Sequence, residues 1–310
     1  MCTHHTGSYL QLKGLLPSSL IDRHYKIISD PKDIRRLKYQ GLEHTVITHD
    51  HKKDMWTLDT ADSKTSGISR ASHASFTLGR HNWTITGDKG LNEGESYTIE
   101  LKMSGCQKGE FTCNDGQCVS MEERCNQLPH CRDKSDEIDC KILDIDEGYN
   151  MRVPPVMFDE PVNVFVFLDI LKIVDINEPD YSIEVQFEIM LKWTENRVKY
   201  NNLKKIDALN SLMEEDFQKL WLPEVVYENT DQKKSTRLGE VWEWRTDVLV
   251  KREEEHGTMS GLHIIDETEV FNGSRNSLIM NQTYTHTFQC NFQLSYYPFD
   301  VQVYIIKMLR

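Results

Sequence analysis

The clearest pattern in the chain is an alternation of apolar and mostly polar side chains between residues 183 and 193. Every second position there is apolar: Ile183, Val185, Phe187, Ile189, Leu191 and Trp193. Because successive side chains of a β-strand point to opposite faces of a sheet, this alternation predicts a half-buried antiparallel strand. A second, more apolar strand is predicted over Val162–Val174, with Asp175–Asp180 as the turn between the two. Strands of this kind favour a β-sandwich.

Helical periodicity is weak throughout the chain. The best candidate is a short helix over Asp207–Leu220, with Met213, Phe217 and Leu220 on one face. The first hundred residues instead show short runs of strand-forming residues among turns, at Thr45–Ile47, Trp56–Leu58, Ser75–Leu78 and Tyr97–Leu101. Residues 1–105 are therefore predicted to form a separate β-rich module.

Composition and motifs narrow the function classes. The 36 basic and 49 acidic side chains of the 310 residues give a net charge of −13, which argues against nucleic acid as the main partner. No apolar run approaches the roughly 18–20 residues that span a bilayer. The nucleophile motifs of hydrolases, such as Gly-x-Ser-x-Gly, are also missing, so we expect no enzyme.

Six of the eight cysteines lie between Cys106 and Cys140, and the other two are Cys2 and Cys290. This density is typical of a small extracellular module that is stabilised by disulfides because it cannot build a core. The cysteine spacing alone leaves fifteen pairings open. The N-terminus has neither the basic nor the apolar stretch of a secretion signal, so we expect the chain to be a fragment.

The cysteine segment resembles the LDL-receptor class A repeat over its whole length. Phe111 lies two residues before the second cysteine, Gly116 two before the third, and Asp133-Lys134-Ser135-Asp136-Glu137 precedes the last. The resemblance implies the disulfide pairs Cys106–Cys118, Cys113–Cys131 and Cys125–Cys140.

The same resemblance implies a Ca²⁺ site in this module. Its side-chain ligands would be Asn126, His130, Asp136 and Glu137, and its carbonyl ligands would be those of Glu123 and Leu128. Asn126 and His130 depart from the carboxylates of the family, and a nitrogen is a poor ligand for this hard cation. A weakened Ca²⁺ site and a module held by disulfides alone both stay open.

Four motifs follow one another in the C-terminal half of the chain. They are Asp175-Ile176-Asn177-Glu178, Trp193-Thr194-Glu195-Asn196-Arg197-Val198, Leu220-Trp221-Leu222-Pro223-Glu224 with Asn229, and Cys290 leading to Tyr297-Pro298-Phe299-Asp300-Val301-Gln302. Together they resemble the extracellular ligand-binding domain of the Cys-loop (pentameric) ligand-gated ion channels. The resemblance implies that Trp193 and Trp221 pack in the core and that Arg197 pairs with an acid.

The resemblance also has departures. The second cysteine of the family's signature loop is replaced by Tyr304, so the loop disulfide cannot form and Cys290 is expected to be a buried free thiol. The residues that follow Cys290, Tyr297 to Gln302, would contact a membrane domain in an intact receptor.

Agonists of this family bind between subunits among aromatic side chains, which attract cationic ligands. Glu188 and Glu228 occupy two positions that are usually aromatic, and Tyr227 stands one place before the second. If the two glutamates line a pocket, they favour a cationic ligand. Ordinary surface charge stays open as the alternative for both.

We therefore expect a mainly β protein. Its parts would be a β-rich module over 1–105, a class A repeat over 106–140, a linker over 141–153, and an incomplete immunoglobulin-like β-sandwich of the channel ligand-binding type over 154–310.

The expected function is that of the extracellular portion of a channel-like receptor subunit. It would bind a small extracellular ligand, assemble with other subunits into a pentamer and couple to a membrane domain that follows this chain. Glycosylation sequons at Asn82, Asn272 and Asn281 fit the extracellular face of the plasma membrane. A secreted, pore-less ligand-binding or adhesion protein stays open as the alternative.

Overall fold

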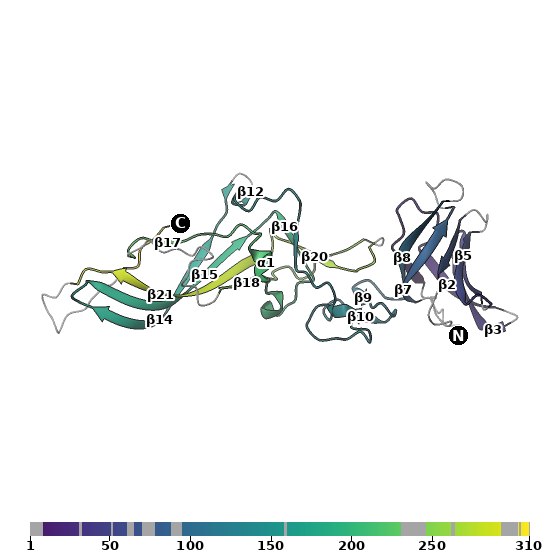
Figure 1. Ribbon diagram of the computed structural model, residues 1–310, viewed down its shortest axis with the longest axis horizontal. Helices are drawn as coiled ribbons and strands as arrows, with labels where there is room; N and C mark the ends of the chain where they lie inside the picture. Colours follow the sequence, from purple (N-terminus) through teal and green to yellow (C-terminus); the bar gives the residue numbers. More distant parts are fainter. Residues whose placement is uncertain are drawn as a thin grey trace, which may run out of the picture. The chain divides into compact units, whose positions relative to one another are not determined.

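The computed structural model (Figure 1) divides into two compact units. It describes residues 9–30, 33–50, 52–60, 65–69, 78–87, 95–157, 160–230, 246–261, 264–292, 303 and 305–309. The first unit comprises Met1–Cys140 together with Thr258–Val270, and the second comprises Lys141–Gly257 and Phe271–Arg310. A short segment from the C-terminal half of the chain thus belongs, by its contacts, to the N-terminal unit.

Eight antiparallel strands of the first unit form a closed barrel in sequence order, because β1 pairs with both β2 and β8. The strands are β1 (Leu10–Lys13), β2 (His24–Asp30), β3 (Asp33–Gly41), β4 (Thr45–Asp50), β5 (Met55–Thr60), β6 (Ser66–Ser69), β7 (Gly79–Thr86) and β8 (Ser96–Ser104). Tyr25, Tyr39, Trp56 and Trp83 are almost fully buried in its interior. The expected β-rich module is confirmed.

Three of the four short strands predicted in this module lie within β4, β5 and β8. The fourth, Ser75–Leu78, falls almost wholly outside the described residues. The closure of the barrel was not predicted, because the pairing of β1 with β8 joins segments about ninety residues apart in sequence.

The disulfide-rich module follows the barrel. It consists of the hairpin β9 (Glu110–Thr112) and β10 (Cys118–Ser120) and the short 3₁₀ helix η1 (Ser135–Glu137). Its disulfides are Cys106–Cys118, Cys113–Cys131 and Cys125–Cys140, with Cα–Cα distances of 5.4, 5.8 and 5.4 Å. These are the pairs that the class A resemblance implies.

The second unit is built on a four-stranded antiparallel sheet of order β14-β15-β21-β18. The strands are β14 (Phe165–Asn177), β15 (Ser182–Thr194), β21 (Ser277–Gln289) and β18 (Thr246–Lys251). The alternation between residues 183 and 193 is β15, and all six of its apolar side chains are buried. The strand predicted over Val162–Val174 is β14, shifted three residues toward the C-terminus.

The remaining elements are short. They are β11 (Leu143–Ile145), β12 (Val156–Met157), β13 (Glu160–Pro161), β16 (Val198–Asn201), β17 (Val226–Tyr227), β19 (Thr258–Met259), β20 (Glu269–Asn272), β22 (Met308–Leu309), the 3₁₀ helix η2 (Asp207–Asn210) and the helix α1 (Glu214–Phe217). Within the described residues, no helix is long and apolar enough to cross a bilayer.

The helix predicted over Asp207–Leu220 is wrong as one continuous element. The segment splits into η2 and α1 because the chain between them joins the sheet. The N–H of Leu212 donates to the carbonyl of Val248 at 2.8 Å, and Ser211 forms a β-bridge with Leu249. These tertiary hydrogen bonds replace the helical ones over the middle of the segment.

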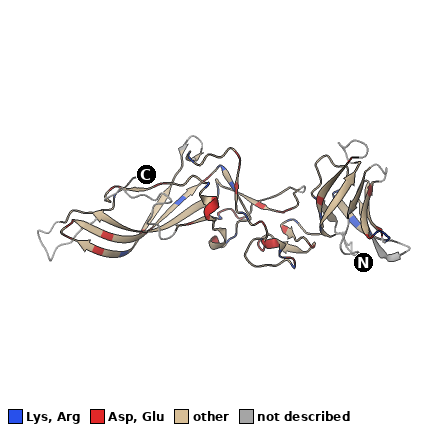
Figure 2. Cartoon of the chain, viewed as in Figure 1, with Lys and Arg blue, Asp and Glu red and all other residues tan. Residues whose placement is uncertain are grey.

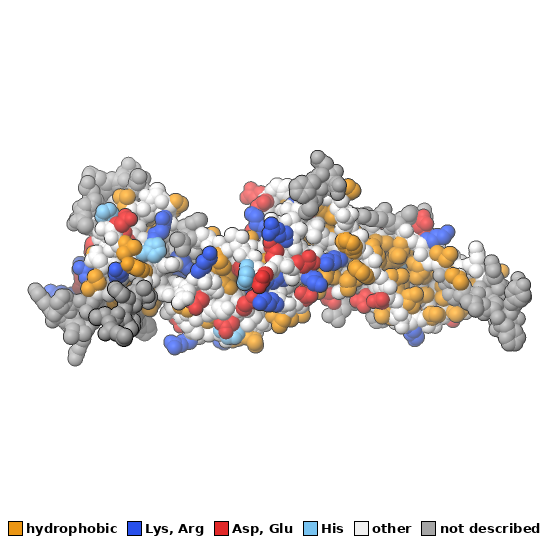
Figure 3. All heavy atoms as spheres, turned by 180° about the vertical axis from the view of Figure 1, so that it is seen from behind, with side chains coloured by type: hydrophobic (Ala, Val, Ile, Leu, Met, Phe, Trp, Pro, Cys, Tyr) orange, Lys and Arg blue, Asp and Glu red, His pale blue; other side chains and the backbone are white. Residues whose placement is uncertain are grey.

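Acidic residues are spread over both units, including the disulfide-rich module, α1 and the long strands (Figure 2). Apolar side chains gather over the sheet that contains β14 (Figure 3). β14 is exposed along most of its length, with Phe165 60% and Phe167 53% accessible.

Candidate functional site

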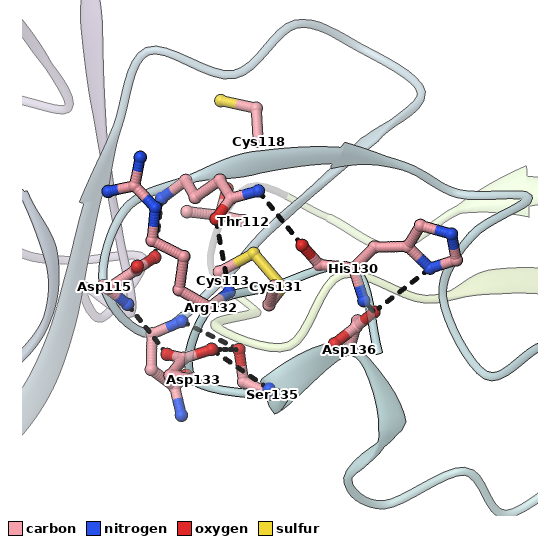
Figure 4. The surroundings of a disulfide bond; sticks show 12 residues. Thr112, Cys113, Asp115, Cys118, His130, Cys131, Arg132, Asp133, Ser135 and Asp136 are labelled. Carbon is pink, nitrogen blue, oxygen red and sulfur yellow. Dashed lines mark hydrogen bonds and ion pairs between the residues drawn. A yellow bond between two sulfur atoms is a disulfide. The ribbon is translucent and has the colours of Figure 1, made fainter. Parts of the chain in front are cut away.

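The side chains predicted to hold a cation lie together in the loops of the disulfide-rich module. Asp136 in η1 is fully buried, and its Oδ2 accepts a hydrogen bond of 2.6 Å from the backbone N–H of His130. The Nδ1 of His130 lies 3.6 Å from the same oxygen (Figure 4). The other oxygen, Oδ1, is buried and has no hydrogen-bond partner among the described residues. An unpaired buried carboxylate oxygen is a position that a cation or a water would satisfy.

The other predicted ligands already accept hydrogen bonds from the backbone. The carboxylate of Glu137 accepts from the N–H groups of Asn126 and Gln127 at 2.9 and 3.0 Å. The Oδ1 of Asn126 accepts from the N–H of Leu128 at 3.0 Å. These oxygens keep further lone pairs for a cation, although His130, Asp136 and Glu137 do not form one of the close groups of potential metal ligands among the described residues.

Neighbouring polar residues in Figure 4 hold the loops of the module in place. Asp133 accepts hydrogen bonds from the backbone N–H and the hydroxyl of Ser135 at 3.0 and 2.7 Å, and from the N–H of Asp115 at 3.0 Å. The tightest groups of potential metal ligands in the described residues contain Cys106 and Cys118, or Cys113 and Cys131. Their sulfurs are bonded to each other in disulfides and hold no metal.

Tyr227, one of the predicted ligand-binding residues, is fully buried on β17. Its ring lies 5.5 Å from that of Phe187, 5.3 Å from His286 and 6.0 Å from Phe288. Tyr284 on β21 completes this cluster. Burial raises the pKa of Tyr227 above its ordinary value. The sequence did not predict this aromatic cluster, although the alternation of β21 at positions 284, 286 and 288 is the signal that could have indicated it.

The two predicted glutamates lie apart from this cluster. Glu188 follows Phe187 on β15, so its side chain points to the opposite face of the sheet, where it is half-buried. Glu228 is exposed, and its backbone N–H donates to the carbonyl of Lys307 at 2.9 Å. Glu188 and Tyr227 thus do not converge on one site within the described subunit, and their ligand-binding role stays a prediction.

Of the predicted signature loop, Cys290 is described, whereas Tyr297, Pro298, Phe299, Asp300 and Gln302 lie outside the described residues. Cys290 is a half-buried free thiol whose pKa is raised by burial. Its N–H donates to the carbonyl of Tyr181 at 2.7 Å, and the ring of Tyr181 stacks on that of Phe292 at 6.1 Å. The start of the loop is therefore attached to the turn between β14 and β15.

The pairing of Arg197 with an acid is confirmed. Its Nε and Nη2 lie 2.8 and 2.6 Å from the two carboxylate oxygens of Glu195, which is fully buried. The hydroxyl of Tyr149 donates to Glu195 at 2.9 Å and accepts from the N–H of Trp221 at 2.7 Å. Burial raises the pKa of Tyr149 to about 12. Trp193 and Trp221 pack edge to face at 6.5 Å, so this motif stabilises the domain.

A buried charged cluster of the first unit has no sequence signal. Lys13 on β1 and Lys102 on β8 place their Nζ atoms 2.5 and 3.4 Å from the two oxygens of Glu267. Next to Glu267 in sequence, Asp266 forms an ion pair with Arg80. Burial opposes ionisation of Glu267, but the charges of Lys102 and Lys13 hold its pKa below the ordinary value. Segments so distant in sequence meet only in the folded structure.

The three sequons differ in accessibility. Asn82 on β7 and Asn272 at the end of β20 are exposed. Asn281 lies in the middle of β21, paired with Met190 on one side and Asp247 on the other, and its side chain is half-buried. Glycosylation of these asparagines stays a prediction, with Asn82 and Asn272 as the more accessible acceptors.

Comparisons with known proteins agree with these features. A model of the neurotransmitter-gated ion-channel ligand binding domain matches residues 140–308, and a model of the low-density lipoprotein receptor domain class A matches residues 104–140. A vitellogenin receptor of Solenopsis invicta is 33% identical over 63 residues, which are 20% of this chain and 4% of that receptor. The chain therefore spans only a small part of that relative.

Proposed function

Because the chain belongs to the family of neurotransmitter-gated ion-channel ligand binding domains, we propose that it is the extracellular portion of a receptor subunit of this family. In this role it binds a small extracellular ligand, assembles with other subunits into a pentamer on the outer face of the plasma membrane, and couples binding to a pore. The match over residues 140–308 carries the proposal, and the buried Glu195–Arg197–Tyr149 network at the family's motif supports it.

The ligand is proposed to be cationic, because Glu188 and Glu228 stand where the family usually has aromatic side chains. The test is a titration of the chain with tetramethylammonium, after mass photometry has determined its assembly state. We expect binding to the pentamer that Glu188→Gln weakens several-fold. Glu184→Gln is the matched control, since Glu184 lies on the same face of β15 four residues away. Equal affinities of the two variants would contradict a role for Glu188.

Coupling to a pore is tested separately by reading the transcript beyond the codon of Arg310. We expect apolar segments of about 20 residues, each long enough to span a bilayer as a helix. A stop codon there, together with a secretion signal upstream of Met1, would instead support the secreted, pore-less binding protein.

We further propose that the class A module binds Ca²⁺ weakly. The match over residues 104–140 and the buried, unpaired Oδ1 of Asp136 support this, while Asn126 and His130 weaken the site. Calorimetry on the chain should detect Ca²⁺ binding that Asp136→Asn abolishes and Asn126→Asp strengthens about tenfold, as added ligand charge does. Asp144→Asn, outside the module, is the control. Absence of a Ca²⁺ signal at millimolar concentration would leave a module held by disulfides alone.

A further inference from the structure

A hairpin from the C-terminal half of the chain is part of the first unit. It consists of β19, β20 and the loop between them. Its residues Thr258–Val270 belong to the first unit by their contacts, although β18 and β21, on either side in sequence, belong to the second. This segment carries Asp266, Glu267 and Glu269 but no lysine or arginine. We call Thr258–Val270 the acidic hairpin.

Two carboxylates of the acidic hairpin pair with basic side chains of the barrel. Glu267 accepts hydrogen bonds from the Nζ atoms of Lys13 on β1 and Lys102 on β8 at 2.5 and 3.4 Å. Asp266 forms an ion pair with Arg80 on β7. Lys13, Lys102 and Glu267 are almost fully buried. The hairpin therefore cannot leave this position without removing the shared carboxylate from two buried ammonium groups, which is costly.

The acidic hairpin also contacts the class A module. Met259 packs against the small core of the module, which consists of Phe111, Cys113, Val119, Met121 and Cys131. Next to this core, the guanidinium of Arg124 lies 4.0 Å from the centre of the Phe111 ring. Burial lowers the pKa of Arg124, and the charges of Asp266 and Glu267 oppose this shift. One short segment thus interacts with the barrel and with the module at once.

The barrel and the class A module also contact each other through their backbones. The N–H of Arg80 donates to the carbonyl of Asn114 at 2.8 Å, and the Nζ of Lys102 donates to the carbonyl of Thr112 at 2.8 Å. The approach is close, since a Cβ at Gly79 would lie 2.1 Å from the carbonyl oxygen of Asn114. Each such hydrogen bond adds only modestly to net stability, so a third segment that contacts both parts determines how firmly they are joined.

We propose that the acidic hairpin is a strap that holds the class A module against the barrel. Glu267 attaches the strap to β1 and β8, and Met259 attaches it to the core of the module. The barrel closes on itself and three disulfides cross-link the module, so each part keeps its own fold when the strap is released. The strap determines their orientation relative to each other. This inference concerns the first unit alone and does not depend on the proposed receptor function.

Single-molecule fluorescence energy transfer on the full chain tests whether this orientation is fixed. A donor at Asp59, exposed on β5, and an acceptor at Arg132, exposed in the module, are introduced as unnatural amino acids, so that the cysteines stay untouched. The native chain should give one narrow peak of transfer efficiency. Glu267→Gln should replace this peak by a broad distribution, because the side chain no longer carries the charge that two buried ammonium groups share. A contribution of Glu267 to stability alone would leave the peak of the folded molecules unchanged.

Two further variants complete the test, with near-ultraviolet circular dichroism of the buried Trp56 and Trp83 to show that the barrel is folded in each. Met259→Ala removes the contact with the module without touching a buried charge, so it tests the strap even if Glu267→Gln does not fold, and should broaden the peak. Glu255→Gln is the matched control. It removes the same charge from a side chain that is 88% exposed, and should leave the peak unchanged. A narrow peak in both Glu267→Gln and Met259→Ala, or equal broadening in the control, would overturn the proposal.

Discussion

The barrel of the first unit and the sheet of the second are both antiparallel. They differ in how many strands have a partner on each side and in how far their apolar side chains are buried. In the barrel every strand has two neighbours, and its large aromatic side chains share one interior. In the sheet, β14 pairs with β15 on one side and leaves most of its apolar side chains exposed. In a closed barrel all inward side chains share one core. The apolar side chains of an edge strand, in contrast, are buried only when a second surface covers them.

The comparison predicts a large loss of stability for one aromatic-to-alanine substitution and almost none for another. Trp83→Ala in the barrel should cost about 3–5 kcal/mol of unfolding free energy, because it leaves a cavity among buried side chains. Phe167→Ala on β14 should change the stability of its unit by less than about 0.5 kcal/mol, as exposed sites do. Urea unfolding followed by hydrogen exchange of each unit would measure both. A large cost for Phe167→Ala would show that β14 is covered in solution.

The Glu267 cluster should be the main polar contribution to the first unit. Glu267→Ala leaves Lys13 and Lys102 buried without their shared carboxylate, and should cost about 3 kcal/mol. The control is Glu269→Ala, two residues away on β20 and only half-buried. Hydrogen exchange should report the loss in β1 and β8 and not in the sheet of the second unit. Equal effects of the two variants would contradict the cluster's role.

The same cluster predicts a pH dependence of the first unit. The folded state holds the pKa of Glu267 below its unfolded value. Its stabilising effect is therefore complete above the ordinary glutamate pKa and is lost as pH falls through the lower, folded value, with a slope of at most about 1.4 kcal/mol per pH unit. Stability curves of the native chain and Glu267→Gln should converge in acid. Parallel curves would refute the assignment.

A smaller loss of stability than that of Glu267→Ala is predicted in the polar network of the second unit. Tyr149→Phe removes the hydroxyl that joins Glu195 to the N–H of Trp221, and should cost about 1–2 kcal/mol, because one donor at Trp221 becomes unpaired. Tyr181→Phe, on an exposed turn, is the control. The unfolding midpoint of the second unit alone should shift. A loss of stability as large as that of Glu267→Ala would contradict the prediction that the polar network of the second unit contributes less than the Glu267 cluster.

Local patterns predicted the parts of the fold that depend on short-range chemistry. The alternation of β15 and the pairing of Arg197 are encoded by neighbours in sequence, because a strand's faces and a two-residue ion pair need no distant partner. The prediction of one helix over Asp207–Leu220 was wrong, because the hydrogen bond from Leu212 to Val248 and the β-bridge of Ser211 with Leu249 attach the middle of the segment to β18. Of the candidate site, the cation ligands stay a prediction, whereas Tyr227 packs against the face of β15 that carries Phe187 and Glu188 points to the other face.

The sequence by itself determined the class of the protein, because the cysteine spacing and the order of the motifs are recognisable without the tertiary structure. The tertiary structure decided where distant segments meet. It closed β1 against β8 and brought Glu267 to Lys13 and Lys102. The physical reason is range. Periodicity and motif spacing act over a few residues, whereas burial and ion pairing depend on which surfaces the whole chain brings together.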